Sequence, residues 1–416
     1  MKGVQAELIA IGTELLLGFT VNSNTAFLAR RLAELGVDCY HQVTVGDNPG
    51  RLARAVRLSL TRADWVITCG GLGPTVDDVT LPTLAKAAKR SLVLDRAIVH
   101  RLRERFARLG IPMPQANLRQ AYVPHGAVVL PNRIGTAPGF ILPLRRKLLI
   151  ALPGPPQELE PMFTEQAIPW LKRRYPATGI LVSRTVELTG ITESEVDSKV
   201  ADLLRLRGNV TVGIYAHPAQ VDLRITARGR TAATARSAIR RIETAIRQRL
   251  GPLVYGADDE TLEGVAGRLL ARRRRTLAIA ESCTGGLVGH RITQVSGSSA
   301  YFAGGIVAYA NRMKASLAGV PASLLRKHGA VSDPVARAMA VRIRHAARTT
   351  YGLAITGIAG PTGGTVEKPV GLVYIALADP RRVVCHRHQL TGDRATVKWK
   401  ASQAALDLLR RTLLGS

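Results

Sequence analysis

Aromatic residues, acidic residues and long apolar runs are all scarce in this chain, and each shortage narrows what the protein can be. Aromatic side chains make up 4% of the 416 residues, so the core has to be aliphatic and the stacking platforms of single-strand nucleic-acid binders are few. No uninterrupted run reaches the roughly 18 apolar residues of a membrane-spanning helix. Glu7 and Glu14 interrupt the apolar amino-terminal segment, and no small-residue cleavage site follows it. We therefore expect neither a membrane span nor an export signal.

Cysteine is also rare. The four cysteines, Cys39, Cys69, Cys283 and Cys385, form no C-x-x-C pair and no zinc-type spacing. A disulfide scaffold is not expected in a chain of this size. The pattern favours a reduced protein of the cytoplasm.

The shortage of acidic residues leaves a strong positive charge. Lysine and arginine number 58 against 30 aspartate and glutamate residues, which gives a net charge of +28. Such a charge attracts nucleic acids, anionic lipids and phosphorylated small molecules. Residues 272–275 form a compact basic patch, whereas other cations are spread along amphipathic helices such as residues 101–108. Specific DNA binding is therefore not favoured, although it stays open as an alternative.

The length predicts more than one domain, because single hydrophobic cores stop growing at about 250–300 residues. Hydrophobic residues at 46% and charged residues at 21% are typical of a globular chain. A segment rich in proline and cations at residues 169–176 and a second break at 251–259 indicate the boundaries. We expect an α/β protein with domains at residues 1–170, 171–255 and 256–416, the middle one small and serving as a spacer or subunit contact.

Short apolar runs alternate with amphipathic helical patterns in the first domain. Strands are expected at residues 7–11, 39–45 and 65–69, and helices at residues 24–35 and 51–61. This alternation predicts a parallel sheet covered by helices. Ligands of such sheets bind at the carboxyl ends of the strands, so the loops after Ile11 and Cys69 are the places to look for chemistry.

The other two domains show the same kind of alternation. In the middle domain, strands are expected near residues 185–188, 210–215 and 221–227, and helices near 193–206 and 231–250. In the last domain, strands are expected at 276–280, 304–310, 353–356 and 370–377, and helices at 262–273, 285–293, 311–317 and 335–351.

A glycine-rich loop follows the strand at residues 65–69. It reads GGLGPTVDDVT and spans residues 70–80. Glycines let backbone N–H groups approach phosphate oxygens, and the start of the next helix adds positive potential. The adjacent carboxylates Asp77 and Asp78 are suited to a divalent cation that bridges a pyrophosphate. A tight turn with helix-capping side chains is the alternative interpretation.

A second candidate site follows the strand at residues 276–280. Ser282 lies at a strand-to-helix turn, where backbone N–H groups can stabilise an oxyanion. Tyr309 ends the next strand, and Lys314 follows in the first turns of a helix. A desolvated lysine can lose its proton near neutral pH and act as a base. The alternatives are a capping serine, a solvated lysine, and Cys283 as the nucleophile, since a helix start would lower a thiol pKa.

Four separated motifs in the first domain resemble the molybdopterin-binding-like, three-layer α/β domain that opens proteins of the CinA (competence/damage-inducible) family. The motifs lie at residues 11–18 (IGTELLLG), 70–80, 131–139 and 152–159. The resemblance implies a metal-dependent ADP-ribose pyrophosphatase with Asp77 and Asp78 on the metal, which would be a Mg or Co type of divalent cation. The ligand pocket that it implies consists of Thr13, Glu14, Asn24, Gly71, Gly73, Thr75 and Glu158.

The last domain is similar to the carboxy-terminal CinA domain over residues 258–413. The motifs are AESCTGG at 280–286, SGSSAYF at 296–302, GGIVAYANRMK at 304–314, HGAVS at 328–332, AITGIAGP at 354–361 and KPVG at 368–371. Ser296-Gly297 replaces the Pro-Gly that the family usually has, far in sequence from the proposed dyad. The resemblance implies a cofactor-free nicotinamide-mononucleotide amidohydrolase with Ser282 as nucleophile, Lys314 as base and Tyr309 as its partner. The implied substrate contacts are Thr284, Gly285, Thr356, Gly357 and Arg394, with Arg394 on the 5′-phosphate.

Together the two resemblances imply a hydrolase of pyridine-nucleotide salvage, or NAD recycling, that acts on two small nucleotides. One domain would split ADP-ribose into AMP and ribose 5-phosphate, and the other would convert nicotinamide mononucleotide into nicotinate mononucleotide and ammonia. A homodimer is the expected assembly. A DNA-associated competence factor and a non-catalytic molybdopterin-binding protein stay open as alternatives.

Overall fold

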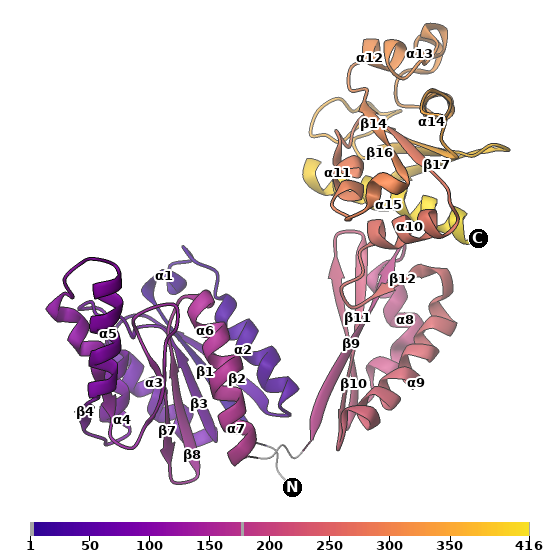
Figure 1. Ribbon diagram of the computed structural model, residues 1–416. Coiled ribbons are helices and arrows are strands. Elements are labelled where there is room, and N and C mark those ends of the chain that lie inside the picture. The colour runs from indigo at the N-terminus through magenta and orange to yellow at the C-terminus, as the bar shows by residue number, and fades with distance from the viewer. Residues whose placement is uncertain (1–3, 176–178, 416) are drawn as a thin grey trace. The chain divides into compact units, whose positions relative to one another are not determined.

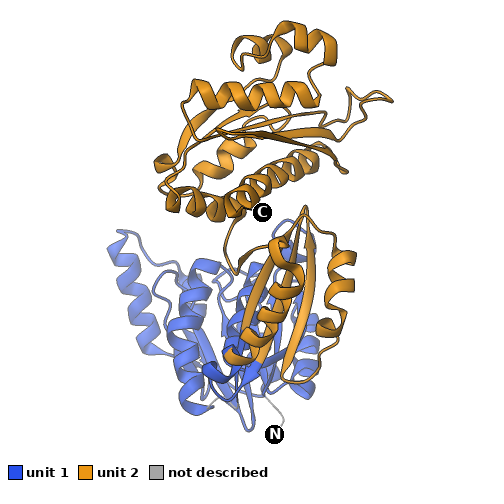
Figure 2. Cartoon of the chain, turned by 90° about the vertical axis from the view of Figure 1, so that its right-hand side faces the viewer, with its two compact units in different colours: residues 1–182, 228–236 blue, residues 183–227, 237–416 orange. Residues whose placement is uncertain are grey.

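The computed structural model describes residues 4–175 and 179–415, and the chain forms two compact units (Figures 1 and 2). Unit 1 comprises residues 1–182 and 228–236, and unit 2 comprises residues 183–227 and 237–416. Unit 1 therefore holds the first predicted domain, and unit 2 holds most of the middle domain together with the last one.

Unit 1 is built on a six-stranded sheet with flanking helices. The strands of unit 1 are β1 (Gln5–Ile11), β2 (Asp38–Val45), β3 (Trp65–Cys69), β4 (Leu92–Leu94), β5 (Tyr122–Pro124), β6 (Val128–Leu130), β7 (Gly139–Leu144) and β8 (Lys147–Leu152). Its helices are α1 (Thr13–Leu16), α2 (Ser23–Glu34), α3 (Pro49–Arg62), α4 (Thr80–Ala87), α5 (Arg96–Arg108), α6 (Pro156–Met162) and α7 (Ile168–Arg174), with a 3-10 helix at Gln115–Ala121 and a π-helix at Phe163–Ala167.

The sheet of unit 1 is mixed, which corrects the expectation of a parallel sheet. The strand order is β2-β1-β3-β8-β7-β6, and the first four strands are parallel. β7 and β6 are antiparallel to their neighbours. A two-residue turn, Arg145-Arg146, joins β7 to β8, and so short a connection permits only antiparallel pairing.

Helices cover both faces of this sheet, as Figure 1 shows. On one face, Leu28 and Leu32 of α2 pack with Met162 of α6 against alternate residues of the central strands. On the other face, Leu52 of α3 and Leu84 of α4 fill the core. Because both faces are covered, the inner parallel strands β1, β3 and β8 are mostly apolar and buried, whereas the edge strand β2 carries exposed polar residues. The three-layer α/β architecture is confirmed.

Proline near the first boundary has a different effect from the one expected. Pro169 lies in the first turn of α7, where a missing N–H costs nothing, so the helix runs through the segment that was expected to interrupt the pattern. Pro176, at the end of that segment, lies outside the described residues.

Unit 2 contains two further sheets. The strands are β9 (Ile180–Thr189), β10 (Val210–His217), β11 (Gln220–Gly229), β12 (Val254–Ala257), β13 (Leu277–Glu281), β14 (Phe302–Val307), β15 (Tyr351–Gly357), β16 (Leu372–Ala378) and β17 (Val383–Gln389). The helices are α8 (Glu193–Leu204), α9 (Ala232–Leu250), α10 (Leu262–Arg272), α11 (Leu287–Thr293), α12 (Asn311–Ser316), α13 (Ala322–His328), α14 (Asp333–Ala346) and α15 (Arg394–Leu414), with 3-10 turns at Gly251–Leu253 and Ser298–Ala300.

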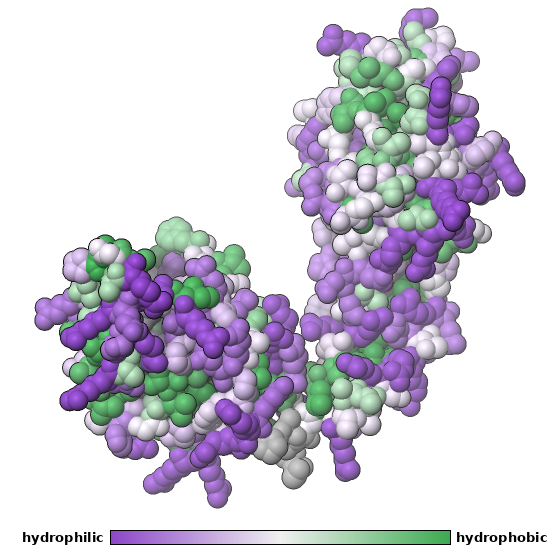
Figure 3. All heavy atoms as spheres, viewed as in Figure 1, coloured by the Kyte–Doolittle hydropathy of each residue, from purple (hydrophilic) through white to green (hydrophobic). Residues whose placement is uncertain are grey.

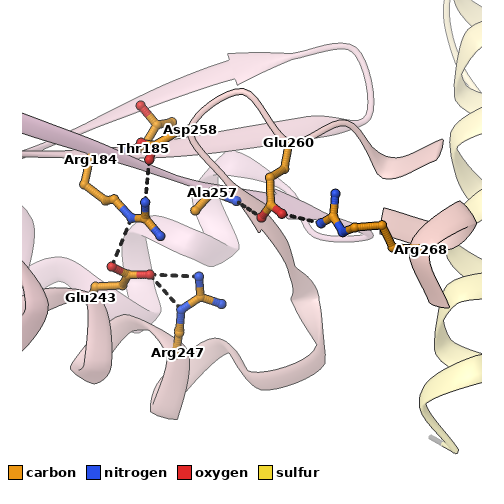
Figure 4. Close-up of polar contacts among 8 residues, drawn as sticks. All are labelled: Arg184, Thr185, Glu243, Arg247, Ala257, Asp258, Glu260 and Arg268. Carbon is orange, nitrogen blue, oxygen red and sulfur yellow. Dashed lines mark hydrogen bonds and ion pairs between the residues drawn. The ribbon is translucent and has the colours of Figure 1, made fainter. Parts of the chain in front are cut away.

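The smaller sheet of unit 2 has the order β10-β11-β9-β12 and is tied together by ion pairs (Figure 4). Arg184 of β9 contacts Glu243 of α9 at 3.2 Å and Asp258, which follows β12, at 2.5 Å. Glu260 pairs with Arg268 of α10. These contacts fix the chain where the middle domain passes into the last domain.

The larger sheet of unit 2 has the order β14-β13-β15-β16-β17. β14, β13 and β15 are parallel, whereas β16 and β17 are antiparallel. Helices α10, α11 and α15 pack on one face, and α14 packs on the other. The carboxyl ends of the three parallel strands therefore lie side by side at one edge of the sheet.

Two expectations for the last domain need correction. The strand expected at residues 304–310 spans Phe302–Val307, so Tyr309 lies in the loop after the strand and does not end it. The helix expected at residues 335–351 ends at Ala346, and Tyr351 already opens β15. The sequence patterns also did not indicate α13 or the 21-residue α15. Across residues 4–175 and 179–415, we find no helix that combines the length and the apolarity needed to cross a bilayer.

Candidate active sites

The serine and the lysine singled out in the last domain line one cavity of about 330 Å³. It lies at the carboxyl ends of the parallel strands β14, β13 and β15. Tyr309, Gly357 and Arg394 line it as well. The structure thus brings together four segments that are separate in sequence.

Ser282 is held in place by the backbone around it. It directly follows β13 and its side chain is buried. Its N–H donates to the carbonyl of Ile355 at 2.9 Å, and its own carbonyl accepts from the N–H of Gly285 at 3.1 Å. Gly285 has a φ of 62°, a conformation that glycine adopts readily. The turn therefore fixes the hydroxyl at the cavity wall.

Lys314 is the unusual group of this cavity, because it is a lysine with only 2% of its surface exposed. Its Nζ donates to the carbonyls of Ala308 at 3.0 Å and Tyr309 at 2.9 Å. Burial lowers the pKa of this amine below its ordinary value, while the nearby Cys283 opposes the change. This direction is the one expected for a desolvated lysine.

Tyr309 and Arg394 form the exposed rim of the cavity. The Tyr309 hydroxyl accepts a hydrogen bond from Nη2 of Arg394, and Nη1 of Arg394 donates to the carbonyl of Gly360 at 2.6 Å. Arg394 is the first residue of α15, so the dipole of that helix adds to the positive potential of the guanidinium.

Two of the five expected substrate contacts, Thr284 and Thr356, are fully buried and lie outside the cavity lining. The hydroxyl of Thr356 donates to the carbonyl of Ala330 at 2.8 Å. Gly285 lies in the turn behind Ser282, whereas Gly357 and Arg394 line the cavity.

Glu281 anchors the loop that carries Ser282. This carboxylate is 1% exposed and accepts the N–H groups of Gly286, Val288 and Gly289 at 2.8–3.1 Å. A carboxylate at the start of a helix satisfies backbone donors that would otherwise lack partners. Glu281 therefore orders the start of α11.

The structure reverses the expectation for Cys283. A thiol beside a helix start was expected to have a lowered pKa, but burial raises the pKa of Cys283 to about 12. The side chain is 4% exposed, and desolvation of the thiolate outweighs the favourable backbone dipoles.

Asn311 is a lining residue to which the sequence analysis gave no role. It opens α12 within the GGIVAYANRMK motif and lines the cavity beside Lys314. Its position between the two motif residues Tyr309 and Lys314 was the available signal.

The glycine-rich loop of unit 1 lines a larger cavity of about 550 Å³. The loops after β1, β3 and β8 converge there, at the carboxyl ends of parallel strands. The predicted residues that line it are Glu14, Gly71, Gly73, Asp77, Asp78 and Glu158. Carboxylate side chains and the backbone of the glycine-rich loop thus line the same cavity.

Asp78 is fixed by its own loop. Its Oδ2 accepts the N–H of Thr75 at 2.8 Å and the Thr75 hydroxyl at 2.5 Å. A Cβ on Gly73 would lie 2.4 Å from the same oxygen, so a larger residue there would displace the Asp78 carboxylate. Thr75 holds Asp78 and does not itself line the cavity, while the exposed Asp77 does.

Thr13 and Asn24 also lie outside the lining. The N–H and the hydroxyl of Thr13 both contact Oδ2 of Asp47 at 2.8 Å. Asn24 donates to the carbonyl of Gly154 at 2.7 Å, which ties α2 to the loop after β8. Both residues shape loops of the cavity from behind.

Several lining residues were missed by the sequence analysis, among them Asp47, Arg105 and Gln120. Asn132, from a motif already singled out, organises its own loop: it donates to Oε2 of Glu158 at 2.6 Å and accepts the N–H of Gly135 at 2.7 Å. Asp47 and Arg105 lie outside the recognised motifs, so no signal pointed to them.

The donor set suits a loosely held divalent cation. Within the described ranges, no group of three or more histidine, cysteine or acidic side chains is arranged to hold a metal ion by itself. Mg²⁺ typically binds one or two carboxylates and keeps waters or substrate phosphates as its other ligands. Asp77 and Asp78 fit that requirement.

Three domain families match the chain in order. Residues 7–173 match the probable molybdopterin binding domain, residues 183–256 the damage-inducible protein CinA KH domain, and residues 259–413 the CinA C-terminal domain. The class is therefore a three-domain α/β protein with a molybdopterin-binding-like domain, a KH domain and a CinA C-terminal domain.

Relatives match over almost the whole chain. A CinA-like protein of Nostoc punctiforme is 45% identical and covers 99% of this chain and 100% of its own length. A CinA-like protein of Dictyoglomus thermophilum is 44% identical with the same coverage. A crystal structure of CinA from Thermoplasma acidophilum is 32% identical and covers 40% of this chain and 98% of that one, with a TM-score of 0.38. This chain belongs to the CinA family.

Proposed function

We propose that the carboxy-terminal domain hydrolyses the amide of nicotinamide mononucleotide by a serine–lysine mechanism. The observation that carries the proposal is a buried lysine of lowered pKa in the same cavity as Ser282. Amide hydrolysis requires a base for the serine proton. Lys314 is a suitable group, because its burial disfavours the charged form of the amine.

The contacts of Lys314 support its role as a base. A neutral amine has two N–H bonds, and Nζ has two backbone carbonyls as acceptors. The lone pair then remains for the proton of Ser282. The serine oxygen attacks the carboxamide carbon, Lys314 takes the proton, and the same proton goes to the departing ammonia. Water then attacks the resulting ester, with Lys314 again as base, and nicotinate mononucleotide leaves.

Other groups supply charge stabilisation and binding. The backbone N–H groups of Cys283 and Thr284, which follow Ser282 in the turn before α11, are the groups to which we assign the oxyanion of the tetrahedral intermediate. Arg394 at the rim is suited to the 5′-phosphate, because guanidinium groups bind phosphate oxygens in pairs. Tyr309 holds Arg394 through its hydroxyl and Lys314 through its carbonyl.

The test is ammonia release from nicotinamide mononucleotide by the full chain. Ser282→Ala is expected to abolish release, and Cys283→Ala is expected to retain most of it as the matched control, since the thiol is protonated at neutral pH. Activity that survives in Ser282→Ala and is lost in Cys283→Ala would assign the reaction to the thiol instead.

We further propose that the amino-terminal domain splits the pyrophosphate of ADP-ribose into AMP and ribose 5-phosphate. The support is the loop of residues 70–78, which presents glycine backbone and two carboxylates to one cavity. Asp77 and Asp78 would hold a Mg²⁺- or Co²⁺-type cation, which supplies charge neutralisation on the pyrophosphate oxygens when bound. Thr75 and Gly73 keep Asp78 in position for that task.

The test is AMP release from ADP-ribose in the same preparation that is assayed for ammonia. Asp77→Ala plus Asp78→Ala is expected to abolish AMP release and to leave deamidation unchanged. Glu160→Ala, an exposed carboxylate on α6 outside the cavity lining, is the control. Undiminished AMP release in the double variant contradicts the assignment of these carboxylates.

The nucleic-acid alternative has less support. KH domains clamp the nucleic-acid backbone with a G-x-x-G loop. The glycines in residues 183–256 are Gly190, Gly208, Gly213, Gly229, Gly251 and Gly256, and no two of them have that spacing. The middle domain thus lacks the usual clamp.

A further inference from the structure

A second cavity opens beside the glycine-loop cavity of unit 1. It has a volume of about 460 Å³ and lies between α5 and the loop at residues 131–138. Arg105, Gly135 and Thr136 line both cavities. The two spaces therefore adjoin, and a ligand in the first can extend into the second.

The second cavity, here named the arginine groove, is strongly basic. Arg101, Arg105 and Arg108 line it from one face of α5, at a spacing of four and three residues, and Arg133 lines it from the opposite loop. Among the described residues that line the groove, none carries a carboxylate. In Figure 3, hydrophilic side chains gather over the α5 side of unit 1.

Carboxylates nearby do little to neutralise these guanidinium groups. Glu104, the one acidic residue of α5, contacts His100 at 3.5 Å. Arg133 pairs with Glu165 at 3.0 Å, but both side chains are exposed and such pairs contribute little. Arg105 donates to the backbone carbonyl of Ile134, a neutral acceptor.

This arrangement costs stability in the absence of an anion. Like charges spaced three and four residues apart on a helix destabilise it by about 0.2–0.5 kcal/mol per pair. A phosphate in the groove would remove that repulsion and accept paired hydrogen bonds from guanidinium groups. The walls also include Ile98, Leu102 and Leu109, which suit the apolar faces of a ribose or base.

We propose that the arginine groove binds a phosphomonoester of a nucleotide whose pyrophosphate lies in the glycine-loop cavity. This inference rests on the proposed pyrophosphatase function for the position of the pyrophosphate. A small nucleotide is favoured over a nucleic acid because the groove is continuous with that cavity through Arg105. The amino-terminal site is then selective for ADP-ribose derivatives that carry an additional phosphate on a ribose hydroxyl.

The experiment measures binding, so it does not depend on cleavage. The full chain is titrated calorimetrically, with EDTA present, with ADP-ribose, ADP-ribose 2′-phosphate and ADP-ribose 3′-phosphate. We expect at least one phosphorylated nucleotide to bind about tenfold or more tightly than ADP-ribose. Arg101→Gln plus Arg108→Gln is expected to bring that ratio to about one.

Arg103→Gln is the matched control, because Arg103 lies on the same helix but does not line the groove. It is expected to preserve the ratio. Equal affinity for all three nucleotides in the unaltered chain, or no binding of any of them, overturns the proposal. A single-stranded oligonucleotide that binds more tightly than the nucleotides, in an Arg101- and Arg108-dependent way, also overturns it and assigns the groove to nucleic acid.

The outcome is separable from that of the proposed function. A phosphorylated nucleotide preferred by the groove but never cleaved would contradict the pyrophosphatase and leave the groove assignment intact. Cleavage of ADP-ribose without tighter binding of the nucleotides that carry an added phosphate would contradict the groove assignment and leave the pyrophosphatase intact.

Discussion

Lys314 is a buried lysine, and its burial suits it to the role of base that we propose. Removing an ammonium from water disfavours its charged form, and two backbone carbonyls then satisfy the neutral amine. The same burial leaves Cys283 protonated. In the proposed mechanism, the same desolvation favours the neutral amine of Lys314 and keeps the thiol of Cys283 out of the reaction.

A pH profile of deamidation tests this account at the residue scale. Because Lys314 acts in its neutral form, kcat/KM is expected to rise with pH and level off at a pKa below the ordinary 10.5. Lys314→Arg is expected to lose about 10²–10⁴-fold in rate, since guanidinium does not deprotonate in this range. A flat profile from weakly acidic to alkaline pH would show that Lys314 does not titrate in the reaction.

Glu187 of β9 is another group whose pKa is shifted by burial. It is 7% exposed, and burial first, then the nearby carboxylates Asp222, Asp258 and Glu260, raise its pKa to about 7 despite a hydrogen bond with Tyr255. The folded state therefore binds this proton more tightly than the unfolded state. The stabilisation of the folded state by this proton is complete at pH values below the pKa that Glu187 has in the unfolded chain. It is lost as the pH rises through about 7, where the folded state releases the proton.

Glu187→Gln is expected to raise the melting temperature near pH 8.5 and to change it little near pH 5. The variant stays neutral, so it avoids a cost of up to about 3 kcal/mol in the alkaline range. Thermal unfolding followed by circular dichroism at both pH values provides the measurement. A variant less stable than the parent at both pH values would show that the carboxylate is not strained.

Helices with a single apolar face could be predicted from the sequence, whereas helices that are buried on several faces could not. Helix α2 was expected at residues 24–35 and spans Ser23–Glu34, because its apolar stripe is clear. Helix α15 buries polar residues such as Gln403, Asp407 and Arg410 beside its apolar ones, so no two-faced pattern marks it.

The candidate sites could likewise be predicted only in part from the sequence. Ser282 was singled out at a strand-to-helix turn, and Tyr309 and Lys314 at the end of the next strand and in the helix after it. The cavity contains all three. Asn24 and Thr356 were expected to contact substrate, yet they donate to backbone carbonyls and do not line the cavities themselves. Sequence shows which loops converge, but the direction of each side chain depends on packing across the chain.

At the scale of the whole molecule, residues on the two sides of the predicted boundary between the last two domains pack against each other. Arg410 of α15 is 2% exposed and donates to the carbonyls of Pro252 at 2.5 Å and Val254 at 3.4 Å. Tyr255 packs into the core of the last domain. The expected boundary at residue 256 therefore separates groups that pack together.

A fragment of residues 251–416 is expected to be more stable than one of residues 258–416. The shorter fragment leaves a buried guanidinium without two acceptors, at a cost of at least about 1.5 kcal/mol. Urea unfolding of both fragments measures the difference. Equal midpoints would show that α15 needs none of the contacts from residues 251–257.

The central claim is that Ser282 forms the covalent intermediate of amide hydrolysis. The full chain is mixed with nicotinamide mononucleotide, quenched in acid within the first turnovers, digested and examined by mass spectrometry. The account predicts a nicotinate-mononucleotide ester on the peptide that contains Ser282, located on the serine oxygen and absent from Ser282→Ala. An adduct on the sulfur of Cys283, or ammonia released by Ser282→Ala at the rate of the unaltered chain, would contradict it.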